Sequence, residues 1–90
     1  MAYARVLNME FKSGEDLEIF MGKWKNWFPE NMPAALSRTI CRTAENAFLL
    51  MATYENEVTA TQAKENVEQF FKTQANHIHD IIDFHGPVME

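Results

Sequence analysis

The 90-residue sequence has few of the residues that make a chain disordered or cross-linked. It contains three glycines, three prolines and one cysteine, and 23% of its residues are charged. With 47% hydrophobic and 12% aromatic residues, the composition is typical of a folded globular chain rather than a disordered or low-complexity one. The length suits one hydrophobic core, so we expect a single domain over residues 1–90.

Long apolar runs are also absent. No segment approaches the roughly 18–20 consecutive apolar residues of a membrane-spanning helix, and the first residues, MAYARVLNMEFK, lack the apolar core of a secretion signal. Since Cys41 is the sole cysteine, an intrachain disulfide and a cysteine zinc site are excluded. We therefore expect a cytoplasmic protein without a membrane partner, in which Cys41 is a buried, unreactive thiol.

Positive charge is scarce, which bears on the class of partner. Eight Lys and Arg stand against 13 Asp and Glu, for a net charge of −5. Residues 1–45 carry six charges of each sign, whereas residues 46–90 carry only Lys64 and Lys72 against seven carboxylates. Binding to nucleic acid needs clustered Lys and Arg to neutralise phosphates. Nucleic acid is therefore not an expected partner.

The spacing of apolar residues predicts six elements in the order βαββαβ. The expected strands cover 3–11, 35–43, 47–54 and 77–85, with Gly86-Pro87 ending the last one. The first helix begins at a Ser13 cap and ends before Pro29, and the second covers 57–76 after a cap at Asn56 or Thr59.

This order predicts an α+β ferredoxin-like sandwich, in which two right-handed βαβ units interleave. The antiparallel sheet would then have the strand order 4-1-3-2, with both helices on one face. Residues 47–54 are apolar on both sides, which suits a central strand. The arginines of 35–43 and the acids and histidines of 77–85 suit edge strands.

Two helices cover one face of such a sheet, so the other face of strand 47–54 should be polar in a monomer. Either set of alternate residues leaves an aliphatic or aromatic surface on the open side. A contiguous exposed apolar patch usually marks an interface. We therefore expect a homodimer packed through the open faces of its sheets, with the edge strands and the tail 86–89 extending towards the partner.

The segment AFLLMATYEN (47–56) resembles the third strand of the dimeric α+β barrel superfamily, which includes the antibiotic-biosynthesis-monooxygenase-like proteins. In that group an apolar run ends in an aromatic residue and an acid just before the second helix; the aromatic residue is commonly Trp, and here it is Tyr54. The resemblance covers the whole chain in element order and length and implies the ferredoxin-like fold and a dimer. The superfamily contains monooxygenases, haem-degrading enzymes, dismutases, decarbonylases and members without known chemistry, so the resemblance implies no single activity.

The resemblance also implies where a pocket would lie. Cofactor-free monooxygenases of the superfamily hold aromatic substrates between sheet and helices, where Trp24, Trp27, Tyr54 and Phe70 would line a site for a small apolar ligand. Trp24 and Phe70 also fit the core stripes, whereas Trp27 lies off its stripe and would cover a pocket mouth. Haem-degrading relatives place an asparagine on the first strand, as Asn8 is here, and a histidine ligand on the second helix.

No histidine occurs in residues 57–76, so we expect no haem, and no other cofactor is indicated. The densest polar cluster is on one face of the last predicted strand and consists of His77, His79, Asp83 and His85. Alternate strand positions are about 7 Å apart, so an HxH pair would suit a divalent metal. Ile81 interrupts the row, and a solvated edge or a dimer rim explains the same residues. We assign no metal.

The three arginines, Arg5, Arg38 and Arg42, all fall on predicted strands. They would either converge on an anionic ligand or pair across the dimer with Glu10, Asp80 or Asp83. The sequence leaves both arrangements open.

The function indicated is that of a small homodimeric binding or accessory protein. The alternative is a cofactor-independent monooxygenase or isomerase that acts on an apolar cyclic substrate. No catalytic residue is identified, and the candidate pocket residues are Asn8, Trp24, Trp27, Tyr54, Phe70 and His79. In a dimer structure, a continuous internal cavity above about 300 Å³ reached by Tyr54 or His79 would favour ligand chemistry, whereas a filled interior would favour an interaction role.

Overall fold

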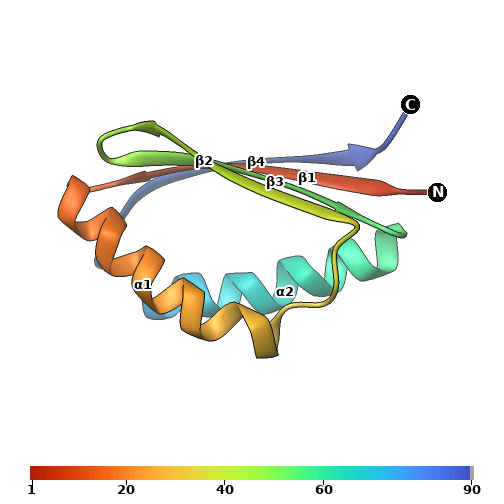
Figure 1. Cartoon of the computed structure of the whole chain (residues 1–90), viewed down its shortest axis with the longest axis horizontal. Helices are drawn as coiled ribbons and strands as arrows, with labels where there is room; N and C mark the ends of the chain where they lie inside the picture. The colour runs from red at the N-terminus through yellow and green to blue at the C-terminus, as the bar shows by residue number, and fades with distance from the viewer. Residues whose placement is uncertain (90) are drawn as a thin grey trace.

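The computed structural model describes residues 1–89 and has the predicted βαββαβ order (Figure 1). The elements are β1 (Tyr3–Phe11), α1 (Gly14–Asn31), β2 (Ser37–Ala44), β3 (Ala47–Tyr54), α2 (Glu57–Thr73) and β4 (Ile78–Pro87). The antiparallel sheet has the order β2-β3-β1-β4, which is the predicted order read from the other edge. Figure 1 shows both helices on one face of the sheet and none on the other. Neither helix is long and apolar enough to cross a bilayer, as far as residues 1–89 are concerned.

Side-chain caps start both helices. The Ser13 hydroxyl accepts a hydrogen bond from the backbone N–H of Asp16 at 3.1 Å. The Asn56 side chain accepts one from the N–H of Thr59 at 2.9 Å, so Asn56 rather than Thr59 is the cap. Each cap satisfies an N–H that has no partner within the helix.

The first helix is longer than predicted, because it continues through Pro29 to Asn31. A proline removes one N–H and crowds the carbonyl one turn earlier, but near the C-terminus of a helix little regular structure remains to be disturbed. The Asn31 side chain also donates to the Trp27 carbonyl at 2.7 Å, which satisfies one of the last carbonyls. The prediction that the helix ends before Pro29 was therefore wrong.

Other bounds shift by a few residues. The second helix ends at Thr73 rather than 76, because Gln74 leaves the helical region and its carbonyl accepts from the N–H of His77 at 3.0 Å. The last strand extends to Pro87 rather than 85, and Pro87 lies opposite Tyr3. A proline is tolerated there because β4 is an edge strand. Strand β2 covers Ser37–Ala44 instead of 35–43.

The core lies between the sheet and the helices, and aromatic rings dominate one part of it. Phe20 of α1 is 1% exposed, and its ring centroid lies 5.0–5.9 Å from four other phenylalanines. These rings come from β1, β3 and α2 and belong to Phe11, Phe48, Phe70 and Phe71. A second part consists of small residues around the buried Tyr54: Ala52, Ala60 and Ala63.

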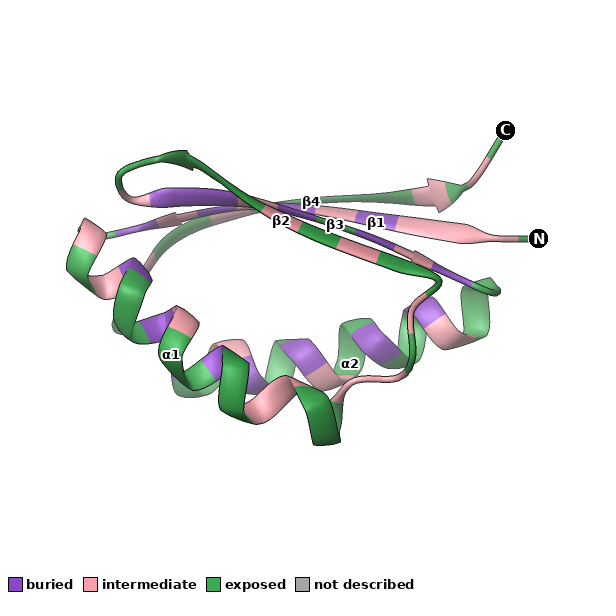
Figure 2. Cartoon of the chain, in the orientation of Figure 1, coloured by how far each residue is buried: buried purple, intermediate pink, exposed green. Residues whose placement is uncertain are grey.

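The open face, meaning the face of the sheet away from the helices, carries the other alternate side chains. Along β1, Leu7, Met9 and Phe11 are buried beneath the helices, which places Asn8 on the open face. Figure 2 shows the same division, with buried segments on the helix sides that face the sheet and a largely exposed β4. Five large apolar side chains occupy the open face: Val6, Leu49, Met51, Ile82 and Phe84.

Candidate functional site

The aromatic part of the core, between the sheet and the helices, is almost completely filled. The void among Leu7, Trp24 and Leu50 measures about 10 Å³. That volume is close to the minimum for one water molecule and far below that of a ligand cavity. This void therefore has no room for an enclosed ligand in the single chain.

A much larger hollow lies between the two helices. The interhelical groove, lined by residues 23, 27, 30, 31, 66, 69, 70, 73 and 74, has a volume of about 610 Å³. Its walls come from the second half of α1 and the second half of α2, joined by a hydrogen bond from the Asn66 side chain to the Asn31 carbonyl at 2.8 Å. This groove lies outside the sheet–helix interior in which a pocket was expected.

Three of the predicted pocket residues meet beside this groove. The Trp27 ring stacks on that of Phe70 with centroids 4.7 Å apart, and Trp24 lies 5.6 Å from Trp27. Trp24 and Phe70 are buried core residues, whereas Trp27 is partly exposed. Trp27 and Phe70 line the groove itself.

The other three predicted pocket residues lie elsewhere. Asn8 is on the open face, opposite Leu49 and Ile82 on the neighbouring strands. Tyr54 is 2% exposed in the alanine-rich part of the core. The His79 side chain is 64% exposed and lies 3.4 Å from the Glu10 carboxylate. The six residues therefore do not form one pocket.

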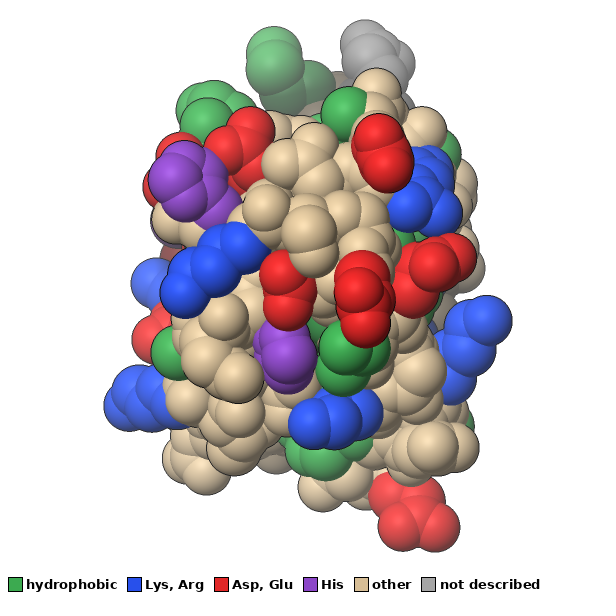
Figure 3. Space-filling model, turned by 90° about the vertical axis from the view of Figure 1, so that its left-hand side faces the viewer, with side chains coloured by type: hydrophobic (Ala, Val, Ile, Leu, Met, Phe, Trp, Pro, Cys, Tyr) green, Lys and Arg blue, Asp and Glu red, His purple; other side chains and the backbone are tan. Residues whose placement is uncertain are grey.

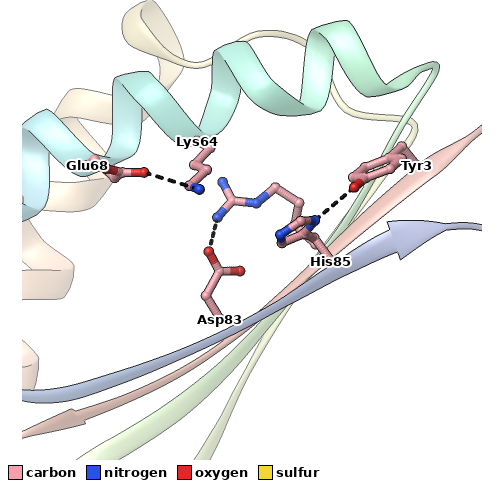
Figure 4. A network of polar contacts seen from close by, with 6 residues as sticks. Tyr3, Lys64, Glu68, Asp83 and His85 are labelled. Carbon is pink, nitrogen blue, oxygen red and sulfur yellow. Dashed lines mark hydrogen bonds and ion pairs between the residues drawn. The ribbon is translucent and has the colours of Figure 1, made fainter.

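A polar cluster occupies the β4 side of the helix-covered face (Figure 4). The Arg5 guanidinium donates to the Asp83 carboxylate at 2.6 Å, with the Arg5 side chain 7% exposed and that of Asp83 28% exposed. Next to this ion pair the Tyr3 hydroxyl and His85 Nδ1 are 2.8 Å apart. Figure 4 shows Lys64 extending from α2 towards these residues. Both contacts join a residue of β1 to a residue of β4, so the cluster ties these two strands together.

The histidines do not form the row that was predicted for one face of the last strand. The register between β1 and β4 shifts between Glu10 and Phe11, which breaks the alternation around His79. His77 lies before the strand and contacts Asp16, whereas His79 contacts Glu10. Within residues 1–89 no group of three His, Cys, Asp or Glu side chains is arranged to hold a metal ion.

His77 takes part in a link between the start of α1 and the start of β4. Its Nδ1 lies 2.6 Å from one Asp16 oxygen, and the Ser13 hydroxyl donates to the other at 2.6 Å. The hydrogen bonds from Ser13 and then from His77 hold the pKa of Asp16 below its ordinary value. The serine and the histidine both bind the carboxylate rather than each other, so this is not a nucleophile–base pair.

The arginines do not converge on one site. Arg5 pairs with Asp83 of its own chain, whereas Arg38 lies 5.3 Å from the centre of the Phe28 ring. Arg42 donates to the Glu45 carbonyl at 2.5 Å and lies 3.7 Å from the Glu18 carboxylate. Each arginine therefore has separate partners.

Cys41 is exposed, contrary to the prediction of a buried thiol. The alternation of β2 left open which side faces the helices, and the pairing of Ile40 with the buried Leu50 places Cys41 on the open face beside Leu49.

Figure 3 shows acidic and basic side chains interspersed at one end of the molecule, without a patch of one sign.

Sequence reasoning missed the amide side chains of the groove, Asn31, Asn66 and Gln74. One signal was available for Gln74. The buried stripe of α2 runs through Ala63, Val67 and Phe70, and Gln74 continues it one turn later as a polar residue that is 5% exposed. A polar side chain at an apolar stripe position needs a partner or a function.

No family model and no curated protein matches the sequence. Among solved structures, a dimeric ferredoxin-like protein from an uncultured marine organism is similar, with a TM-score of 0.80, 17% identity, and coverage of 99% of this chain and 89% of that one. The chain therefore has the ferredoxin-like fold.

Two further structures show the same fold. A provisionally assigned antibiotic biosynthesis monooxygenase from Nitrosomonas europaea has a TM-score of 0.78 and 16% identity, over 98% of this chain and 90% of that one. The monooxygenase from the ActVA-Orf6 gene of Streptomyces coelicolor, in complex with nanaomycin D, has a TM-score of 0.71 and 12% identity, over 99% and 88%. The predicted ferredoxin-like fold and superfamily resemblance are confirmed at the level of the fold.

Proposed function

We propose that this protein is a homodimer that binds a small molecule, and that two copies pack through the open faces of their sheets. The observation that carries the dimer is the apolar surface on that face. Met51, Ile82 and Phe84 are 50%, 45% and 64% exposed, respectively, in a single chain. Burial of such side chains stabilises an association by roughly 25 cal/mol for each Å² of apolar area removed from water. The ferredoxin-like protein from the marine organism is itself described as dimeric.

Sedimentation equilibrium at micromolar concentration tests the dimer. We expect the wild type to sediment with twice the mass of one chain and Phe84→Asp to sediment as a monomer, because it places a charge in the apolar interface. Val58→Asp is the matched control, since Val58 is 78% exposed on α2, outside the sheet. A wild-type monomer would overturn the dimer, as would dissociation of Val58→Asp to the same extent.

The small-molecule site that we propose is the interhelical groove. Its volume of about 610 Å³ is within the ordinary range for ligand pockets, and the partly exposed Trp27 lies on it. The void in the aromatic core, also lined by one of the predicted pocket residues, Trp24, is only about 10 Å³.

A set of small organic fragments, followed by the backbone amide NMR signals, tests this placement. Shifts at Trp27 and Asn66 would support the groove. Shifts confined to Leu50 and Phe71, which line the interior void, would show that the fragments bind between sheet and helices instead. No shifts in either region would overturn the binding function.

Oxygenation of an apolar cyclic compound is the second candidate, favoured by the likeness to the ActVA-Orf6 monooxygenase. That chemistry would need the interior to open, because the present void does not admit a ring system. Nanaomycin D is a direct probe: we expect neither quenching of Trp24 fluorescence nor uptake of dioxygen. Saturable quenching together with dioxygen uptake would replace the binding function by the enzymatic one.

We also propose a cytoplasmic location. The single cysteine, Cys41, supports it, because an unpaired thiol is typical of a reducing compartment.

A further inference from the structure

The middle of the open face is an uncharged block of side chains from three neighbouring strands. Residues paired across antiparallel strands point to the same side of the sheet, so the pairing of β3, β1 and β4 arranges the open face in rows. Two adjacent rows make up the block: Leu49, Asn8 and Ile82 in one, and Met51, Val6 and Phe84 in the other. Five of these six side chains are apolar, so this block is the part of the open face that gains most from being covered.

One row beyond the block, towards the end of β1, the open face becomes acidic. Glu10 lies directly opposite Asp80 on β4. The Glu10 carboxylate lies 3.4 Å from His79 Nε2, and the Asp80 carboxylate accepts a hydrogen bond from the backbone N–H of Ile81 at 3.0 Å. The Glu10 side chain is still 47% exposed, and Asp80 is exposed. Like charges placed directly opposite each other destabilise a strand pair, so this row calls for an explanation.

The row on the other side of the block carries no charge. It consists of Thr53, Ala4 and Gly86. Ala4 and Glu10 are six positions apart on the same strand, which corresponds to about 20 Å. The two ends of the open face therefore differ in charge, and a second copy of the chain meets different surroundings according to its direction.

Two copies related by a twofold axis can align their β1 strands in two ways when the open faces pack together. If the two strands run in the same direction, Glu10 faces the partner's Glu10 across the roughly 10 Å that separate packed sheets. If they run in opposite directions, block covers block and Glu10 faces the partner's Ala4. The acidic rows are then about 20 Å apart along the sheet, more than twice the Debye length of about 8 Å at physiological ionic strength.

We propose that the two β1 strands of the dimer run in opposite directions, and that Glu10 and Asp80 impose this orientation. Each acidic row lies at the rim of the interface, over the partner's Ala4 and the partner's Gly86, where it keeps contact with water. The acids act by making the other alignment unfavourable, which is how repulsion gives an interface its specificity. This inference rests on the proposed homodimer and specifies how the second copy is oriented.

A lysine at position 4 tests the orientation through the sign of its effect. In the proposed dimer Ala4→Lys faces an acidic row twice, so we expect the dissociation constant from sedimentation equilibrium to fall about three- to tenfold. In the other alignment the two new lysines would face each other, and the constant would rise. Val58→Lys is the matched control, because it adds the same charge on α2, outside the sheet. A rise for Ala4→Lys, or a change no larger than that of Val58→Lys, would overturn the inference.

Gly86→Lys is a second variant, which faces the partner's Asp80 in the proposed dimer. A side chain fits at this position, because a Cβ atom on Gly86 would have no other atom within 4 Å and the residue does not have a positive φ. We expect Gly86→Lys to tighten the dimer as Ala4→Lys does. Combining either lysine with Glu10→Gln/Asp80→Asn should remove the gain. A gain that persists without the acids would show that the lysines act elsewhere, and the inference would be wrong.

The outcomes separate this inference from the proposed function. If the wild type is a dimer and the lysine variants weaken it, the homodimer stands and the orientation is wrong. If the wild type is a monomer, both proposals fail.

Discussion

The two faces of the sheet are built from the same strands but differ in what surrounds them. On the helix-covered face, Leu50 of β3 is 7% exposed, whereas its neighbour Met51 on the open face is 50% exposed. The same alternation along β1 buries Leu7 and Met9 and leaves Asn8 on the open face. Both faces therefore carry apolar side chains. They differ because the two helices cover one face and leave the other exposed.

The largest expected effect comes from comparing Leu50→Ala with Met51→Ala. Leu50→Ala should lower the free energy of unfolding by about 2–5 kcal/mol at any protein concentration, because it opens a cavity in the core. Met51→Ala should cost less than about 1 kcal/mol in dilute protein, with a larger loss as concentration rises and the dimer forms. Urea denaturation at low and high concentration measures both. A concentration-independent loss for Met51→Ala would contradict the idea that a second copy covers this face.

A smaller effect is expected from polar residues on the two faces. Asp83→Ala leaves the buried Arg5 without its partner and should cost about 1–3 kcal/mol. The double variant Arg5→Met/Asp83→Ala should recover part of this loss, because no buried charge remains. Asn8→Ala on the open face should change stability by less than about 0.5 kcal/mol. Thermal unfolding of the four proteins tests the order, and a double variant less stable than Asp83→Ala would contradict it.

The reactivity of Cys41 sharpens the comparison without altering the core. In dilute protein the exposed thiol should react readily with a chromogenic disulfide reagent, and the rate should fall several-fold as concentration rises and the open faces meet. Ala63→Cys places a second thiol at a fully buried position of the covered face and should react only through unfolding. A Cys41 rate that is constant over all concentrations would indicate that Cys41 lies outside the interface.

The smallest effect concerns the link at the end of the covered face, where Asp16 joins Ser13 to His77. The pKa of Asp16 is lowered in the folded chain, so the ionised carboxylate stabilises the folded state. This stabilisation is fully present above the ordinary aspartate pKa of about 3.9 and is lost as the pH falls through the lowered value. Asp16→Asn should remove this part of the acid destabilisation. Urea midpoints measured from pH 6 down to pH 2 should therefore fall less steeply for Asp16→Asn, and equal slopes would refute the assignment.

The sequence predicted most of the fold because burial on one face imposes a period on each element. The bounds of β1 and β3 agree with residues 3–11 and 47–54, where alternate side chains meet the helices. Prolines misled the prediction at Pro29 and Pro87, because the cost of a missing N–H depends on position: it is small in a last helical turn and on an edge strand.

The site was predicted less well, because alternation does not reveal which side of a strand faces the helices. That ambiguity placed Asn8 and Cys41 in the wrong surroundings, since both lie on the open face. The shift in register between Glu10 and Phe11 is a property of two paired strands and is not visible in residues 77–85 alone. Trp27 does line a hollow, but this hollow is the interhelical groove and not the predicted pocket between sheet and helices.

The pairing of β1 has a consequence for the order in which the chain folds. Strands β2 and β3 are joined by a tight turn at Glu45 and Asn46, so their hairpin forms from residues close in sequence. Strand β1 must meet β4 at the far end of the chain, with Tyr3 opposite Pro87. Closing so long a loop is slow, so we expect the docking of β1 and β4 to limit the rate of folding. Because β1 is a central strand, its pairing with β4 would be the last step of folding and would complete both faces of the sheet.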